Sequence, residues 1–78
     1  MDNFKVKMEL DCRGLKCPMP VIKTRKAIQQ LSSGDILKMI STDPGSINDI
    51  NAWARRTGNR IVHEEHKPGE FVFIIVRN

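Results

Sequence analysis

The chain has 78 residues, of which 28% are charged and 40% hydrophobic, and its formal net charge is +4. This length predicts a single domain over residues 1–78 with a small core. No apolar run approaches the length of a membrane span, and Met1–Lys5 lacks the apolar stretch of a signal peptide. These features argue against a multidomain, membrane-bound or secreted protein. We expect a soluble cytoplasmic protein with reduced cysteines.

The first predicted element is a strand over residues 4–13. Apolar and charged residues alternate here with a period of two, which is typical of a half-buried strand. The apolar positions are Phe4, Val6, Met8, Leu10 and Cys12. Because Cys12 is in phase with the apolar side, we expect its side chain to lie in the core.

An amphipathic helix is predicted from Pro18. Proline is favoured at the first helical position, so Pro18 marks N1, Cys17 is the cap, and Pro20 lies in the first turn. The apolar face contains Pro20, Val21, Thr24, Ala27, Ile28 and Leu31. Ser32-Ser33-Gly34 is expected to end the helix, with glycine in the left-handed conformation.

The position of Cys17 favours a reactive thiol. Free backbone N–H groups and the positive end of the helix dipole would face the sulfur and stabilise the thiolate, which is the nucleophilic form. No acidic residue occurs between Asp11 and Asp35, whereas five basic residues do. Basic neighbours would lower the thiol pKa further and attract acidic partners. The alternative is a buried small residue that merely precedes a helix.

The remaining elements follow in the same order of strand and helix. A strand is predicted over Ile36–Ile40, then a helix capped by Asp43 with Pro44 at N1, or capped by Ser46. Its apolar stripe contains Ile47, Ile50, Trp53, Ala54 and Thr57, and Gly58 ends it.

Two further strands complete the chain. A partly polar strand is expected over Arg60–Lys67, followed by a type II turn at Pro68-Gly69. Residues 71–76 are continuously apolar, which indicates a strand that is central or covered on both faces.

The order βαβαββ predicts an α+β fold of two layers. Right-handed crossovers place both helices on one face of a mixed four-stranded sheet. The other face would then be bare, which suggests a surface for a partner or for self-association.

Several kinds of chemistry lack the residues that they need. The candidate general bases, His63 and His66, lie in a strand far from Cys17 in the sequence, so no hydrolase site is indicated. Three residues after Cys17, where a redox CxxC motif has its second thiol, the chain has Pro20. Two histidines three apart in a strand point to opposite faces, so we expect no metal site.

A lone activated thiol can still attack a sulfur that a donor protein presents as a cysteine persulfide. Such an exchange follows thiol–disulfide logic and needs no internal base and no pocket, and we expect no metal or cofactor. It needs a docking surface around the thiol. Candidates are an apolar centre of Met19 and Ile22 and a basic ring of Arg13, Lys16, Lys23 and Arg25.

The stretch from Leu10 to Pro20, LDCRGLKCPMP, resembles the signature of the TusA/SirA sulfur-carrier family, whose core is Cys-Pro-x-Pro. The resemblance continues at Gly34, Asp43-Pro44, Asp49-Ile50 and Gly58, and covers essentially the whole chain. It implies the two-layer fold, a persulfide on Cys17, and helix-start prolines at Pro18 and Pro20. It gives no catalytic role to Cys12.

The resemblance also implies partners of two kinds. One is a sulfur donor, such as a cysteine desulfurase or a rhodanese-like protein, and the other is an acceptor protein. Relatives serve tRNA thiolation, molybdenum-cofactor sulfuration, sulfur oxidation and selenium metabolism, and the match does not choose among them. Nucleic acid would be involved only through an acceptor.

Two other readings remain open. A small basic domain can bind RNA or an acidic protein, although its few aromatic residues do not suit base stacking. A thiol-based redox sensor would use a disulfide between Cys12 and Cys17. In the leading interpretation the chain is a sulfur carrier, formally a sulfurtransferase.

Overall fold

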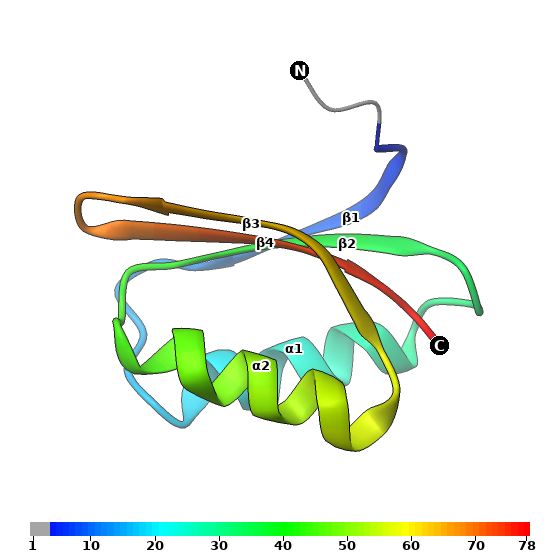
Figure 1. Ribbon diagram of the computed structural model, residues 1–78, viewed down its shortest axis with the longest axis horizontal. Coiled ribbons are helices and arrows are strands. Elements are labelled where there is room, and N and C mark those ends of the chain that lie inside the picture. The colour runs from blue at the N-terminus through cyan, green and yellow to red at the C-terminus, as the bar shows by residue number, and fades with distance from the viewer. Residues whose placement is uncertain (1–3) are drawn as a thin grey trace.

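The computed structural model describes residues 4–78, and its chain forms four strands and two helices (Figure 1). The elements are β1 (Val6–Cys12), α1 (Met19–Gln29), β2 (Ile36–Ser41), α2 (Gly45–Thr57), β3 (Arg60–Lys67) and β4 (Glu70–Val76). Residues 1–3, which belong to the predicted domain range and to the segment tested for a signal peptide, lie outside the described part of the chain.

The four strands form one mixed sheet in the order β1-β2-β4-β3. β1 runs parallel to β2, and β4 is antiparallel to both of its neighbours. Both helices lie on the same side of this sheet (Figure 1). The α+β class and the two-layer arrangement are therefore confirmed, and the continuously apolar last strand is indeed central.

The core lies between the sheet and the helices. Its fully buried side chains include Leu37 and Met39 from β2, Phe73 and Ile75 from β4, and Ile50 from α2. Alternate residues along a strand point to the same face of the sheet. The side chains of these strand residues therefore share the face that packs against the helices. The prediction that Cys12 lies in the core is confirmed, because none of its surface is exposed.

The open face of the sheet is partly covered by its own side chains. Val72 and Ile74 of β4 are only 6% and 5% exposed, although they alternate with residues that face the helices. Phe4 and His63, whose ring centroids lie 6.0 Å apart, line the same hollow as these two residues. The expected bare face is therefore a shallow groove with a small apolar floor.

Both helix starts differ from the sequence prediction. α1 begins at Met19 and not at Pro18, because the Met19 N–H bonds to the Lys16 carbonyl at 2.9 Å in a turn that places Pro18 outside helical geometry. α2 begins at Gly45, with Pro44 as its N-cap. Neither Asp43 nor Ser46 caps it through a side chain, and the Asp43 carboxylate bonds instead to a neighbouring loop.

One helix end is also shifted. α1 ends at Gln29, five residues before Gly34, although Gly34 has the predicted left-handed conformation with φ of +89°. α2 ends at Thr57, and Gly58 follows it as predicted, with φ of +78°. Both helices run back from the carboxyl ends of two adjacent parallel strands, so they start at the same end of the sheet (Figure 1). This topology brings the loop before α1 next to the loop before α2.

Candidate functional site

Cys17 lies in the loop between β1 and α1, two residues before the helix, and its side chain is exposed. The peptide bond that follows it, to Pro18, is cis. The backbone N–H of Cys17 donates a hydrogen bond to Asp43 Oδ2 at 3.0 Å, across to the loop before α2. Its thiol donates to Asp49 Oδ2 at 2.6 Å, in the second turn of α2. Two carboxylates from another part of the chain therefore hold this residue.

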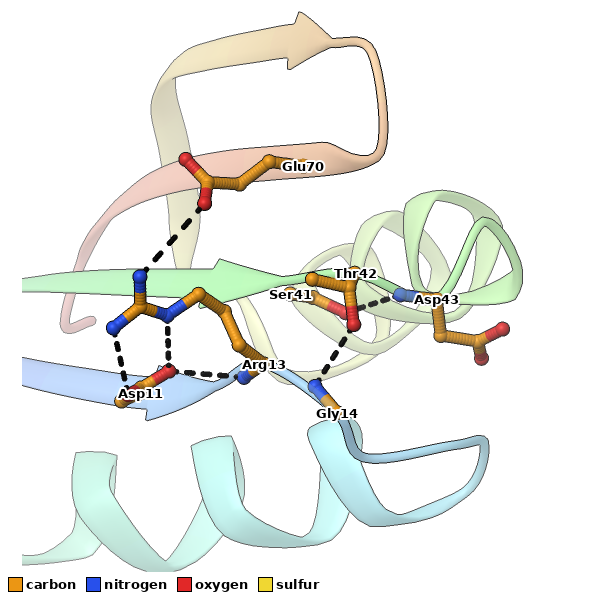
Figure 2. Close-up of polar contacts among 7 residues, drawn as sticks. All are labelled: Asp11, Arg13, Gly14, Ser41, Thr42, Asp43 and Glu70. Carbon is orange, nitrogen blue, oxygen red and sulfur yellow. Dashed lines mark hydrogen bonds and ion pairs between the residues drawn. The ribbon is translucent and has the colours of Figure 1, made fainter.

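The loop that carries Cys17 is fixed at its base to the end of β2. The Gly14 N–H donates to Thr42 Oγ1 at 2.8 Å, and the Asp43 N–H donates to Ser41 Oγ at 3.2 Å (Figure 2). Gly14 has φ of +82°, which glycine adopts at little cost. The buried Ser41 therefore orients the loop from which Asp43 reaches Cys17.

Arg13, at the start of the same loop, is paired with carboxylates of the sheet. Its guanidinium binds both carboxylate oxygens of Asp11, at 2.9 and 3.0 Å, and approaches Glu70 of β4 at 4.0 Å (Figure 2). The Arg13 guanidinium lowers the pKa of Asp11 to about 2. A residue expected in a docking ring is thus already paired with two carboxylates of its own chain.

The electrostatic setting of Cys17 is the reverse of the expected one. Its pKa lies above the ordinary value for a thiol, first because of the hydrogen bond to Asp49, then because of desolvation and the charges of Asp49 and Asp43. The prediction of a lowered pKa was wrong because it considered the helix dipole and the basic residues close in sequence, but not these two carboxylates. The two carboxylates lie 26 and 32 residues further along the chain.

The structure spreads the other predicted docking residues over three surfaces. Lys16 lines a hollow that it shares with Asp43, directly beside the loop of Cys17. Lys23 lines a second hollow with Met8 and Leu10, at the edge of β1. Arg25 lines a third, together with Trp53 of α2. Of these three cations, Lys16 is the one that belongs to the loop that carries Cys17.

The apolar residues of the predicted patch differ in exposure. Met19, the first residue of α1, is 39% exposed and lies two residues after Cys17. Ile22 is half-buried, and Pro20 is buried in the core side of the helix. Pro18 is exposed and forms the N-cap. Met19 is therefore the large apolar side chain that the surface presents next to the thiol loop.

The second cysteine and the histidines occupy other environments. Burial raises the pKa of Cys12, which lies at the end of β1. His63 pairs with Glu65 at 3.0 Å, and His66 pairs with Glu64 at 2.5 Å, so the two histidines point to opposite faces of β3 as expected. Within residues 4–78, no three of the His, Cys, Asp and Glu side chains are grouped to hold a metal ion.

Within the same described range, neither helix has the length and apolar character to cross a membrane.

Residues 8–77 match the family described as sulfurtransferase TusA. The chain is 41% identical over 70 residues to the sulfur carrier protein TusA of Allochromatium vinosum. The matched region covers 90% of this chain and 92% of that one.

Two further likenesses extend this match. A longer protein of Aquifex aeolicus, also named as a sulfur carrier, is 40% identical over 96% of this chain and 38% of its own length. The crystal structure of a SirA-like protein from Desulfitobacterium hafniense superposes with a TM-score of 0.79 at 25% identity, covering 88% of this chain and 95% of that one. The chain belongs to the TusA family of sulfur carrier proteins.

Proposed function

We propose that this protein carries sulfane sulfur as a persulfide on Cys17, which it accepts from a donor protein and passes to an acceptor protein. The observation that carries this proposal is the exposed thiol of Cys17, in a loop that is hydrogen-bonded at two points to the loop before α2. A thiol that must enter the active sites of two different proteins in turn has to stand on the surface. The surrounding loops keep it in one position while partners change.

The transfer needs one sulfur nucleophile and no enclosed pocket. The sulfur of Cys17 attacks the outer sulfur of the donor persulfide, the donor S–S bond breaks, and the donor thiol leaves. A second exchange of the same kind moves the sulfur from Cys17 to the acceptor. The reaction consumes no oxidant or reductant, because the sulfane sulfur keeps its oxidation state throughout.

The donor would be a cysteine desulfurase or a rhodanese-like protein, and the acceptor a protein of tRNA thiolation, cofactor sulfuration or sulfur metabolism in the cytoplasm. Docking would use the surface beside the thiol. Met19 supplies its apolar centre, and Lys16 is the cation next to Cys17 in the sequence, whereas Lys23 and Arg25 line two other hollows and Arg13 is paired with Asp11.

Sulfur loading tests the proposal directly. The protein is incubated with a cysteine desulfurase and cysteine, and its intact mass is then measured. We expect a gain of one sulfur atom in the parent and in Cys12→Ser, and no gain in Cys17→Ser. Equal loading of Cys17→Ser and the parent would disprove the role of Cys17. RNA binding that persists in Cys17→Ser, without any loading of the parent, would support the basic binding module instead.

A charge reversal tests the docking surface. Lys16→Glu is expected to slow loading from an acidic donor surface several-fold, and more strongly at low salt, because salt screens charges on exposed surfaces. Lys26→Glu is the matched control, since Lys26 lies beside Lys23 in a different hollow. Equal rates for the two variants at low salt would remove Lys16 from the docking surface.

A further inference from the structure

Two carboxylates contact Cys17, but they contact different atoms of it. Asp43 accepts a hydrogen bond from the backbone N–H, whereas Asp49 accepts the hydrogen of the thiol itself, with 2.6 Å between Sγ and Oδ2. No ion pair with a cation is found for either carboxylate among residues 4–78. Asp43 therefore positions the main chain, and Asp49 is the group in contact with the reacting sulfur.

We propose that Asp49 is a catalytic residue of sulfur transfer, which keeps the Cys17 thiol protonated in the free carrier and takes its proton as the sulfur attacks. This inference rests on the proposed function of Cys17. Asp49 lies on a helix and is half-buried, so its carboxylate is held on a rigid element. The residue therefore has both the contact and the fixed position that a proton acceptor needs.

The step balances without any further reactant. The thiol proton moves from Cys17 Sγ to Asp49 Oδ2, and the sulfur attacks the outer sulfur of the donor persulfide. A new S–S bond forms on Cys17, the donor S–S bond breaks, and the donor sulfur leaves as a thiolate. The proton on Asp49 then passes to that thiolate. The products are a Cys17 persulfide, a donor thiol and the original Asp49 carboxylate.

The physical reason for this route is charge. If Cys17 lost its proton to solvent, a thiolate would stand 2.6 Å from a carboxylate, and like charges at this distance repel strongly. If the proton moves to Asp49, the pair keeps a single negative charge, now on sulfur. The raised pKa of the Cys17 thiol agrees with this account, because the hydrogen bond to Asp49 is its largest cause.

The proposal predicts a distinctive pH dependence of loading. The charged groups that act on Cys17 are Asp49 on α2 and Asp43 in the loop before α2, and Lys16 precedes it in its own loop. With Asp49 as the proton acceptor, loading should vary little between pH 6 and 8, because the proton passes from the thiol to the carboxylate during the attack and no prior loss of the proton to solvent is needed. Without the carboxylate, loading should follow the thiolate fraction, which rises about tenfold per pH unit below the thiol pKa.

The experiment compares the parent with Asp49→Asn, and uses two measurements. The first is the ultraviolet absorbance of the Cys17 thiolate against pH, corrected with Cys17→Ser. The second is the loading rate from inorganic polysulfide at pH 6 to 8, expressed as the ratio of parent to variant, in which the ionisation of the donor cancels. Glu9→Gln is the matched control, since it makes the same chemical change at an exposed residue of β1. Asp49→Glu keeps the carboxylate.

We expect the thiol of Asp49→Asn to ionise at lower pH than that of the parent, and the ratio of loading rates to fall about tenfold for each unit of rising pH. Glu9→Gln should match the parent, and Asp49→Glu should restore a flat profile. A ratio that is constant with pH would overturn the proposal, since a merely structural role slows loading equally at every pH. An unchanged thiolate titration would overturn it as well.

The two proposals fail in different ways. If the parent takes up no sulfur at any pH, the proposed function fails, although the thiolate titration would still report the contact with Asp49. If the parent loads normally and the ratio of rates does not depend on pH, the carrier function stands and the role of Asp49 fails. If Asp49→Asn does not fold, Asp49→Glu is compared with the parent instead. A loss of the flat pH profile in Asp49→Glu, without a change in the thiol pKa, would contradict the role of Asp49 as proton acceptor.

Discussion

The two cysteines lie five residues apart in the sequence, and the fold gives them opposite settings. Cys12 ends β1 with none of its surface exposed, whereas Cys17 is exposed in the loop that follows. The pKa of each thiol is raised, but burial raises that of Cys12, and a hydrogen bond to Asp49 is the main cause for Cys17. The Cys12 thiol is shielded from water, whereas the Cys17 thiol is exposed and donates its hydrogen to a carboxylate.

This difference matters for function. Exposing the thiolate of Cys12 requires opening the core, which costs a large share of the folding free energy. Releasing the thiolate of Cys17 requires only that a single proton move to a neighbouring oxygen. A surface thiol can thus be kept protonated in the free protein and still react when a persulfide is presented.

Alkylation should separate the two cysteines by the largest margin. In the folded protein at pH 8, we expect iodoacetamide to modify Cys17 at least about a hundredfold faster than Cys12, because Cys12 reacts only from opened states. Mass spectrometry of quenched samples measures both rates. In denaturant the two rates should become similar, which serves as the control. Comparable rates in the folded protein would mean that the buried setting of Cys12 is not present in solution.

The serine variants of the two cysteines should differ in their free energy of unfolding. Cys12→Ser places a hydroxyl in the core and is expected to lower the unfolding free energy by about 1–3 kcal/mol. Cys17→Ser is exposed and should change it by less than about 0.5 kcal/mol. Urea titration of both variants measures the difference, and equal losses would contradict the assignment of one cysteine to the core and the other to the surface.

The smaller effect is a dependence of stability on pH. Because the pKa of Cys12 is higher in the folded than in the unfolded chain, its stabilising contribution is complete below the unfolded pKa near 8.5 and is lost as pH rises toward the folded value. Above pH 8.5 the parent should therefore lose stability more steeply than Cys12→Ser, by at most about 1.4 kcal/mol per pH unit. Parallel curves for the two proteins would exclude a raised pKa for Cys12.

Much of the fold could be predicted from local patterns. The alternation up to Cys12 identified β1 and placed that thiol in the core, and the apolar run of residues 71–76 identified β4 as central. The bounds of β3, Arg60–Lys67, agree with the prediction. These features depend on neighbours in sequence and on burial, so they can be predicted from the pattern of apolar and polar residues.

The electrostatics of the site could not be predicted in this way. A local reading placed Cys17 among basic residues, but parallel pairing of β1 with β2 sets the starts of both helices together and brings Asp43 and Asp49 to it. The start of α2 was predicted wrongly for a related reason. The side chain expected to cap α2, that of Asp43, bonds across to the Cys17 loop. The Asp43-Pro44 and Asp49-Ile50 positions entered the prediction only as part of the family resemblance. No contact between either aspartate and Cys17 was predicted.

The most direct test of the sulfur-carrier account is to locate the sulfur after loading. Trypsin places Cys12 in the peptide Met8–Arg13 and Cys17 in the peptide Cys17–Lys23, so the two thiols separate cleanly once persulfides have been trapped by alkylation. We predict one additional sulfur on the peptide Cys17–Lys23 and none on Met8–Arg13. Additional sulfur on Met8–Arg13, or on neither peptide, would contradict the account.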